Sequence, residues 1–374
     1  MEYDYVIVGA GIFGAVVAQQ LVEKNKRVLI IERRAHIGGN IYSKKDPETG
    51  IEIHCYGSHI FHTKDDEVWQ YINRFAKFND YVHSVDTRHA GKLYPMPINL
   101  DTINEFFGTK MDPAEAEKFV ADQAKKSGVG SPQNFEEKAI SLVGVELYEA
   151  FLKGYTEKQW HLPATKISPD ILSRIPIRFT RDNRYFMDAK YQGIPESGYT
   201  EIVEKMLASK NISVMLNTIF SEIAEEIPST VKIIYTGQVD ELLDYKLGVL
   251  PYRSLEFEEI KSTETLGRAV INEADAEVPY TRSHDFKYYQ LDKPEIVNNS
   301  NSIIFREYPA DYRPGKEAYY PVNNAESEEL YQKYVKLARE KYPNLLLGGR
   351  LGAYRYWDMD LAIKNALNLV KTIL

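Results

Sequence analysis

Cysteine is nearly absent from this chain of 374 residues, because Cys55 is the only one. A single cysteine excludes an intramolecular disulfide framework and, with an apolar strand that begins almost at Met1, predicts a cytoplasmic protein. We find neither a signal peptide nor an apolar run long enough to span a bilayer, so membrane insertion is not expected. An excess of basic charge is also missing. At a net charge of −8 we expect no nucleic-acid partner, and an anionic ligand needs a local basic pocket.

Two catalytic patterns are lacking as well. His59 and His62 have an i, i+3 spacing, but no third ligand follows at a metal-site spacing, so we expect no metal. Cys55 has no partner histidine motif, which argues against a thiol nucleophile. Tyrosine, in contrast, is abundant, with 27 residues. Such an excess suits a site that stacks rings and hydrogen-bonds phosphates or sugars.

The clearest pattern lies at the N-terminus. It predicts a strand, a helix and a second strand over residues 5–8, 13–24 and 28–31. Gly9, Gly11 and Gly14 form G-x-G-x-x-G between the first strand and the helix, where a dinucleotide diphosphate approaches the helix N-terminus. A glycine turn without a ligand is the alternative, but the complete βαβ context favours the dinucleotide. Glu32 ends the second strand and is placed to accept hydrogen bonds from an unphosphorylated adenosine ribose.

The following residues indicate which dinucleotide binds. A basic and then glycine-rich turn, Gly38-Gly39-Asn40, resembles the turn over the FAD diphosphate in flavoproteins of the glutathione reductase and amine oxidase type. Three later stretches fit the same domain, over residues 198–220, 232–243 and 345–367. The last stretch ends in a helix that we expect Asp358 or Asp360 to cap. In that superfamily the N-terminus of this helix faces the flavin. A second glycine fingerprint for NAD(P)H is missing, so the sequence predicts one discontinuous FAD domain.

The middle of the chain differs from the cofactor domain. Residues 80–165 show helical periodicity and cap signals, which predict a helical insert. Phe151, Tyr155 and Gln159 share one face of a predicted helix, either as core packing or as a ligand face. Residues 166–190 carry six basic and three acidic side chains between prolines. Such a segment is typical of a lid over an anionic ligand, although a solvated basic loop has the same pattern.

Residues 240–320 contain short strand-like runs separated by polar turns, which predict an antiparallel sheet. Near the ends of these runs lie residues placed to close a pocket over the flavin: Arg253, Arg282, Tyr319 and Tyr320. The predicted fold class is therefore α/β, with a discontinuous FAD-binding Rossmann-like domain, an inserted helical domain and an antiparallel β-sheet domain.

Seven segments, taken in order, closely resemble the bacterial UDP-galactopyranose mutase family: YGSHIFHT (56–63), PINL (97–100), GYTEKQW (154–160), YRSLEF (252–257), VPYTR (278–282), YYPVN (319–323) and GRLGAYRYWDMD (349–360). The resemblance covers essentially the whole chain. It implies an enzyme that interconverts UDP-galactopyranose and UDP-galactofuranose, the donor for cell-surface galactofuran, as a cytoplasmic homodimer. It also implies three domains: FAD-binding (1–79, 197–240, 321–374), helical (80–180, with a mobile loop at 164–185) and antiparallel sheet (181–196, 241–320).

The resemblance also implies the roles of individual residues. Arg174 and Arg282 are expected to hold the diphosphate and to act as the catalytic residues. The expected substrate-binding residues are Phe151, Tyr155, Trp160, Tyr185, Phe186, Arg253, Asn272, Tyr320, Tyr356, Asp358 and His83. Among these, Phe151, Tyr155 and Phe186 are expected to receive the uracil ring. The expected cofactor-binding residues are Gly9, Gly11, Phe13, Gly14, Glu32, Arg33, Gly39, Asn40, His59, His62, Thr218, Ile219, Arg350 and Met359.

For this family, the N5 atom of reduced FAD attacks the anomeric carbon, and the isomerisation is redox-neutral overall. Two other functions stay open on the sequence. An amine-oxidase-like or desaturase-like FAD oxidoreductase would share the cofactor domain but would consume an electron acceptor. A flavin-binding protein without catalysis would not need Arg174 and Arg282. If the lid arginines act specifically, Arg174→Lys should impair turnover while Arg178→Lys and Arg181→Lys should be nearly silent.

Overall fold

The computed structural model describes residues 2–174 and 177–374, and at residues 173 and 174 it describes the backbone alone. The N-terminal pattern folds as predicted into β1 (Tyr5–Val8), α1 (Ile12–Val22) and β2 (Val28–Ile31). Both strands are continuous apolar runs with little exposed surface. Runs of this kind are typical of parallel strands that are covered on both faces.

These strands belong to a five-stranded parallel sheet in the order β16-β10-β1-β2-β9. The three partners come from much later in the chain: β9 (Ile212–Met215), β10 (Lys232–Tyr235) and β16 (Leu345–Leu347). The strand order reverses at β1, and ligands of such sheets bind at the carboxyl ends of the strands near this point. The predicted α/β class with a discontinuous Rossmann-like unit is confirmed.

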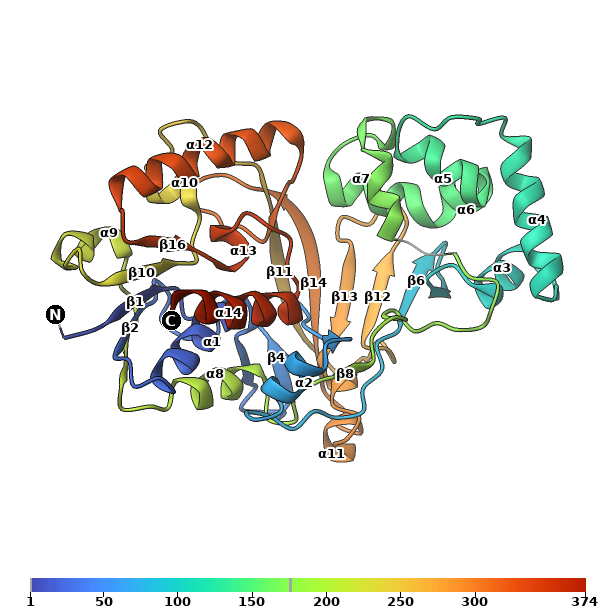
Figure 1. Cartoon of the computed structure of the whole chain (residues 1–374). Helices are drawn as coiled ribbons and strands as arrows, with labels where there is room; N and C mark the ends of the chain where they lie inside the picture. Colours follow the sequence, from blue (N-terminus) through green and yellow to red (C-terminus); the bar gives the residue numbers. More distant parts are fainter. Residues whose placement is uncertain (1, 175–176) are drawn as a thin grey trace.

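Helices cover both faces of this sheet (Figure 1). On one face α1 shares a core with α8 (Tyr199–Leu207) and α14 (Met359–Ile373). On the other face α12 (Ala325–Lys341) and α10 (Val239–Leu242) enclose a second core. Because both faces are covered, the carboxyl edge of the sheet is where the sheet is left open to a ligand.

A seven-stranded sheet stands between the Rossmann-like unit and a helical unit (Figure 1). Its order is β15-β11-β14-β13-β12-β6-β7. Neighbouring strands are antiparallel except β12 and β6, which pair in parallel, so the expectation of a purely antiparallel sheet is corrected. The strands from the second half of the chain are β11 (Tyr252–Ser262), β12 (Val270–Glu273), β13 (Arg282–Asp285), β14 (Ser302–Asp311) and β15 (Tyr320–Pro321).

The expectation of helix from residue 80 onward is wrong at its start. β6 (Val85–His89) and β7 (Lys92–Met96) form a hairpin at the edge of the seven-stranded sheet. The turn residues Ala90 and Gly91 both have positive φ, at 49° and 76°, as in the two-residue turns that match strand twist. Along β6, buried Val85 and Thr87 alternate with more exposed polar residues, which is the strand period of two.

The helical unit therefore begins after this hairpin, at Leu100. Asn99, Asp112 and Asn134 accept backbone hydrogen bonds at the N-termini of its three longest helices. The last part of the helical unit is not regular α-helix, because Tyr148–Lys153 forms a π-helical turn directly before α7. The helices are α3 (Leu100–Phe107), α4 (Pro113–Lys126), α5 (Phe135–Val143), α6 (Val145–Leu147) and α7 (Gly154–Trp160).

Short elements complete the fold. Two small sheets pair β3 (Ser43–Lys45) with β4 (Glu52–His54), and β5 (Phe61–Thr63) with β8 (Tyr191–Gly193). The remaining α-helices are α2 (Asp66–Ile72), α9 (Phe220–Ile223), α11 (Pro294–Val297) and α13 (Gly349–Gly352), and the 3-10 turns are Gly39–Ile41, Ala164–Lys166, Pro169–Arg174, Ala224–Glu226 and Phe286–Tyr289. Within the described part of the chain, the helices are too short or too polar to cross a membrane.

Candidate active site

A cavity of about 900 Å³ opens at the carboxyl ends of β1 and β2. Thirteen of the fourteen residues predicted to bind the cofactor line it, and His62 does not: Gly9, Gly11, Phe13, Gly14, Glu32, Arg33, Gly39, Asn40, His59, Thr218, Ile219, Arg350 and Met359. These residues come from five separate parts of the chain. The tertiary fold thus brings the predicted set together at the expected edge of the sheet.

The glycine turn packs so closely on itself that it has no space for a side chain at Gly14 or Gly39. A Cβ on Gly14 would lie 2.1 Å from the Gly9 carbonyl oxygen, and a Cβ on Gly39 would lie 3.0 Å from the Gly11 Cα. Gly9 and Gly39 also have positive φ, at 106° and 56°. The two glycine-rich turns therefore form a backbone cradle at the N-terminus of α1, and this cradle fits a dinucleotide diphosphate.

Glu32 connects this cradle to the loop after β2. Its two carboxylate oxygens accept hydrogen bonds from the backbone N–H groups of Ala10 and Arg34, both at 2.8 Å. Glu32 is buried and lines the cavity, and its contact with a ribose stays a prediction. The carboxylate therefore fastens the cradle in place while its remaining lone pairs face the cavity.

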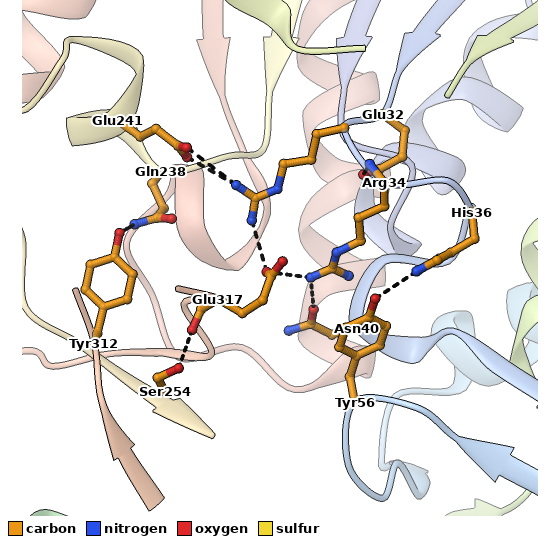
Figure 2. A network of polar contacts seen from close by, with 11 residues as sticks. Glu32, Arg34, His36, Asn40, Tyr56, Gln238, Glu241, Ser254, Tyr312 and Glu317 are labelled. Carbon is orange, nitrogen blue, oxygen red and sulfur yellow. Dashed lines mark hydrogen bonds and ion pairs between the residues drawn. The ribbon is translucent and has the colours of Figure 1, made fainter. Parts of the chain in front are cut away.

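Charged residues cross one side of the cavity, as Figure 2 shows. Glu317 forms ion pairs with Arg33 at 3.0 Å and with Arg34 at 2.6 Å. Sequence reasoning identified Arg33 but missed Arg34 and Glu317. The adjacent arginines in the sequence were a signal for Arg34. Glu317 lies nearly 300 residues away along the chain and had no local signal.

One histidine, His59, lines the cavity, and a second, His62, lies near it. His59 Nδ1 donates to the Gly57 carbonyl at 2.7 Å, and burial lowers the pKa of His59 to about 4. His62 stacks on Phe186, with ring centres 3.7 Å apart, and its Nε2 lies 3.8 Å from the Asp358 carboxylate. Asp358 occupies the N-cap position of α14, but its side chain does not make the predicted cap hydrogen bond. His62 therefore stands behind the cavity wall, next to the start of α14.

Polar side chains from the seven-stranded sheet form a row near the part of the cavity that His59 lines. Asn272 is paired with Arg282 across β12 and β13, and Arg282 with Glu307 across β13 and β14. Directly paired residues present their side chains on the same face. The Arg282 guanidinium is about one third exposed (34%), 3.7 Å from the Glu307 carboxylate and 5.8 Å from the centre of the Tyr155 ring. This row faces α7, so one arginine charge lies between an aromatic ring and a buried carboxylate.

Several polar atoms here are buried without a hydrogen-bond partner among the described residues. They are the Tyr155 hydroxyl, Gln159 Oε1, Arg253 Nε and Asn272 Oδ1. Burial raises the pKa of Tyr155 to about 12, so its hydroxyl stays protonated. Unsatisfied buried polar atoms are rare in native proteins. Their grouping on α7, β11 and β12 indicates a place where a ligand or water supplies the missing hydrogen bonds.

Two cations hold α7 against this sheet. Arg253 donates to the Gln159 carbonyl at 3.0 Å and pairs with Asp311 at 2.6 Å. Lys158 donates to three backbone carbonyls, those of Glu273, Asp275 and Tyr280, at 2.7, 2.8 and 3.2 Å. These contacts set the position of Tyr155 relative to Arg282.

Aromatic residues connect the two halves of the site. The rings of Tyr320 and Tyr356 stack with centres 5.3 Å apart, and the Arg350 guanidinium lies over both, at 5.5 and 5.3 Å. Arg350 also donates to the Trp357 carbonyl at 2.9 Å. Because Arg350 lines the cofactor cavity, this stack extends from the cavity toward the Arg282 row. Burial raises the pKa of Tyr320 well above its usual value, and the nearby Arg350 and Arg282 charges oppose this only in part.

The segment before β8 lies over the same region. Tyr185 donates its backbone N–H to the His83 carbonyl at 2.8 Å, and its ring lies 5.3 Å from that of His83. Burial, reinforced by the nearby Arg282 charge, lowers the pKa of His83 to about 3, so this side chain is neutral near pH 7. Tyr185 itself is exposed (44%).

Not every predicted site residue joins this group. Phe151 is buried in the core of the helical unit, where its ring contacts Tyr94 and Phe106. Trp160 ends α7 and packs partly against the same core. Phe186 lies at His62, as described above, so a uracil face shared by Phe151, Tyr155 and Phe186 stays a prediction. The side chain of Arg174 lies outside the described residues.

The contacts of Arg178 make Arg178→Lys unsuitable as a silent control. Arg178 is buried (7% exposed) and donates to the carbonyls of Asp182 and Arg184, at 3.0 and 2.6 Å. Both bonds come from one nitrogen, Nη1, and a lysine carries its nitrogen on a shorter stem, so it is not expected to reach both carbonyls from the same place. Arg181 is suitable as the control, because its side chain is 75% exposed and pairs with Asp101 at the surface.

If the chain binds the UDP-sugar that the resemblance implies, Tyr155 provides a test of where the nucleotide lies. Tyr155→Ala should weaken the binding of UDP alone about as much as that of UDP-galactose, by roughly tenfold, because a stacked base contributes about 1–3 kcal/mol. Isothermal titration with both ligands measures this. Tyr308→Ala, which removes a ring of β14 whose hydroxyl donates to Glu258 at the surface, is the control. Loss of affinity for the sugar nucleotide with unchanged UDP binding would place the base elsewhere.

Comparisons with known proteins agree with this geometry. A family model described as UDP-galactopyranose mutase matches residues 150–356, and one described as an NAD(P)-binding Rossmann-like domain matches residues 7–75. A crystal structure of reduced UDP-galactopyranose mutase aligns with a TM-score of 0.72 at 16% identity, covering 99% of this chain and 95% of that one. A putative protoporphyrinogen oxidase from Exiguobacterium sp. 255-15 aligns with a TM-score of 0.64 at 12% identity, covering 100% and 99%. At these identities the two structures show a shared fold alone.

Sequence similarity is more specific than fold. The probable UDP-galactopyranose mutase of Klebsiella pneumoniae is 40% identical over 365 residues, which is 97% of this chain and 93% of that protein. The dTDP-fucopyranose mutase of Escherichia coli is 36% identical over 367 residues, which is 96% of each chain. Since the family model matches more than half of the chain and these relatives match nearly all of it, the chain belongs to the UDP-galactopyranose mutase family.

Proposed function

We propose that this enzyme interconverts UDP-galactopyranose and UDP-galactofuranose with the help of FAD. The observation that carries the proposal is the position of the Arg282 row, with its unsatisfied polar atoms, beside a cavity that has a dinucleotide cradle. One end of this arrangement suits a flavin dinucleotide and the other suits a nucleotide diphosphate. Family membership supports the same conclusion.

The cofactor residues have distinct tasks in this proposal. Gly11, Gly14 and Gly39 admit the diphosphate, and Glu32 accepts from the adenosine ribose. The N-terminus of α14 and neutral His59 lie at the flavin end. When bound and reduced, the flavin supplies through its N5 the nucleophile for the anomeric carbon.

The substrate residues follow from charge and stacking. Tyr155 stacks the base, and Asn272 offers an unpaired amide oxygen to the nucleotide. Arg282 holds the diphosphate and stabilises the charge that builds on it as the sugar departs. By resemblance Arg174 assists from the segment around it. Neutral His83 adds no charge to compete with the arginines.

A second candidate substrate is dTDP-fucopyranose, because an enzyme named for it is 36% identical over 96% of this chain. To decide, the purified protein is reduced with dithionite and incubated with UDP-galactofuranose or, separately, with the dTDP-fucofuranose analogue. The products are then separated by chromatography. A higher kcat/KM for UDP-galactofuranose than for the dTDP-sugar supports the proposal. A higher kcat/KM for the dTDP-sugar would show that the dTDP-sugar is the preferred substrate.

We also propose that the reaction needs reduced flavin without consuming reductant, because ring contraction leaves the oxidation state of the sugar unchanged. The ratio of NADPH or dithionite oxidised to product formed should approach zero over many turnovers. One equivalent of reductant oxidised per turnover would reject a redox-neutral reaction, and consumption of an electron acceptor with substrate would favour an oxidoreductase of the amine oxidase type. The fall in the ultraviolet absorbance of NADPH or dithionite, compared with the amount of product separated by chromatography, measures this ratio.

The family resemblance supports three further parts of the proposal. The enzyme acts as a homodimer in the cytoplasm, which sedimentation and cell fractionation can test. The Rossmann-like unit (1–79, 197–240, 321–374) binds FAD, and the segment at 164–185, of which residues 175 and 176 lie outside the described part of the chain, serves as the lid over the substrate. The boundary of the helical domain is moved from residue 80 to residue 100, because β6 and β7 belong to the sheet.

A further inference from the structure

A segment from the seven-stranded sheet covers part of the cofactor cavity. Residues 312–319, called here the bridging segment, connect β14 with β15. Five of its residues line the cavity together with the Rossmann-like unit: Pro314, Gly315, Glu317, Ala318 and Tyr319. A wall of the cofactor site is thus supplied by the sheet that carries Arg282.

Ion pairs attach the bridging segment across the cavity (Figure 2). One carboxylate oxygen of Glu317 lies 3.0 Å from Arg33 Nη2 and 2.6 Å from Arg34 Nη2. Arg33 also contacts Glu241, which follows β10, at 3.4 Å. Arg34 donates to the Asn40 side chain at 2.9 Å, next to the glycine cradle. One carboxylate therefore connects the segment to both arginines that follow Glu32.

Neutral hydrogen bonds attach the segment on its other side. The Glu317 carbonyl accepts from the Ser254 hydroxyl of β11 at 2.7 Å. At the start of the segment, the Tyr312 hydroxyl accepts from the Gln238 side chain at 2.6 Å. The segment is thus fastened to the sheet by its backbone and to the Rossmann-like unit by Gln238 and the two arginines. Arg34 and Arg33 hold the pKa of Glu317 below its usual value, although burial acts in the opposite direction, so this carboxylate is charged at neutral pH.

We propose that Glu317 closes the adenosine side of the cofactor cavity and controls how fast the dinucleotide leaves. The inference rests on the proposed binding of FAD in this cavity. Release requires the bridging segment to separate from the loop after β2, which breaks both ion pairs of Glu317. Because the same segment continues into β15, the cover is part of the sheet that forms the substrate site. Glu317 is a positioning residue in this role, since it acts through Arg33 and Arg34.

Glu317→Gln tests the proposal on the FAD-loaded protein. The variant keeps the shape of the side chain but loses its charge, and FAD should dissociate roughly fivefold to tenfold faster, the size expected for partly exposed charge-assisted pairs. Flavin fluorescence after dilution measures the rate. Raising sodium chloride from low to high concentration should speed release from the unmodified protein more than from the variant, because salt screens the ion pairs.

Glu256→Gln is the matched control. Glu256 pairs with Lys316 of the same segment at 2.6 Å, and both side chains are exposed, at 57% and 40%. Within the described residues neither side chain lines the cavity, so this variant should release FAD at the unmodified rate. Hydrogen exchange of residues 312–319 should increase in Glu317→Gln and not in Glu256→Gln.

The outcomes separate this inference from the proposed function. If the unmodified protein binds no flavin, the proposed cofactor is rejected. If it binds flavin and Glu317→Gln releases it at an equal or slower rate, the cover is rejected and the proposed function stands. Equal acceleration by Glu317→Gln and Glu256→Gln would also reject the cover, because it would reflect a general loosening of the segment.

Discussion

Replacing Arg282 with lysine should lower kcat by roughly a hundredfold while the protein remains folded, since loss of one donor to a developing anion costs about 10²–10³ in rate. Lysine keeps the positive charge beside buried Glu307, whereas a neutral residue would leave that carboxylate without its arginine. What is lost is the planar fork that pairs with two phosphate oxygens. The effect should therefore appear mainly in kcat, because the charge on the diphosphate grows as the sugar departs.

Arg306→Lys is the control for this experiment. Arg306 lies on β14 next to Glu307 and forms an exposed ion pair with Glu258 at 3.4 Å. Steady-state kinetics on the reduced enzyme, with flavin content and Tm recorded for each variant, distinguish a specific role of Arg282 from a general effect of positive charge. Equal losses for Arg282→Lys and Arg306→Lys would show a diffuse electrostatic effect. An unchanged kcat for Arg282→Lys would remove Arg282 from the catalytic residues.

Replacing Gly14 with alanine should abolish cofactor binding. The new Cβ would lie 2.1 Å from the Gly9 carbonyl oxygen and 3.2 Å from the Ile7 side chain. The backbone oxygen belongs to the cradle, so the clash can be relieved only if the turn opens. We expect a loss of stability of about 1–3 kcal/mol, as for overpacked interiors, and purified protein without flavin absorbance.

Gly130→Ala is the matched control, because no atom lies within 4 Å of its Cβ position and its φ is not positive. Its flavin content and Tm should equal those of the unmodified protein. Stoichiometric flavin in Gly14→Ala at an unchanged Tm would contradict the cradle. Retention of Tm with loss of flavin would still support it, since the turn would then have opened without wider unfolding.

Local features of the cofactor site could be predicted from the sequence. The bounds of β1 and β2 agree with the prediction, and so does the position of the glycines between β1 and α1. The positions of Glu32 and of the N-terminus of α14 were also predicted. Each depends on residues within about ten positions along the chain, where turn geometry, periodicity and buried apolar runs act directly.

The sheet next to the helical unit could not be predicted in the same way. β6 and β7 were expected to be helical, yet β6 pairs with β12 almost 190 residues later. The strand conformation is stabilised by partners that no local window contains, and tertiary context overrides weak local preference. The π-helical turn before α7 had no recognisable signal either, although it contains the buried Phe151 and directly precedes the helix that carries the less buried Tyr155.

The sequence by itself thus determined the cofactor cradle, the class of the fold and, through its motifs, the family. Only the tertiary structure decided which charges meet across the site. Glu317 reaches Arg33 and Arg34, and Arg282 reaches Glu307, through strand pairing and loop connections between distant parts of the chain. Ion pairs depend on separations of a few ångströms in space, and spacing along a sequence carries no such information once the chain crosses from one sheet to another.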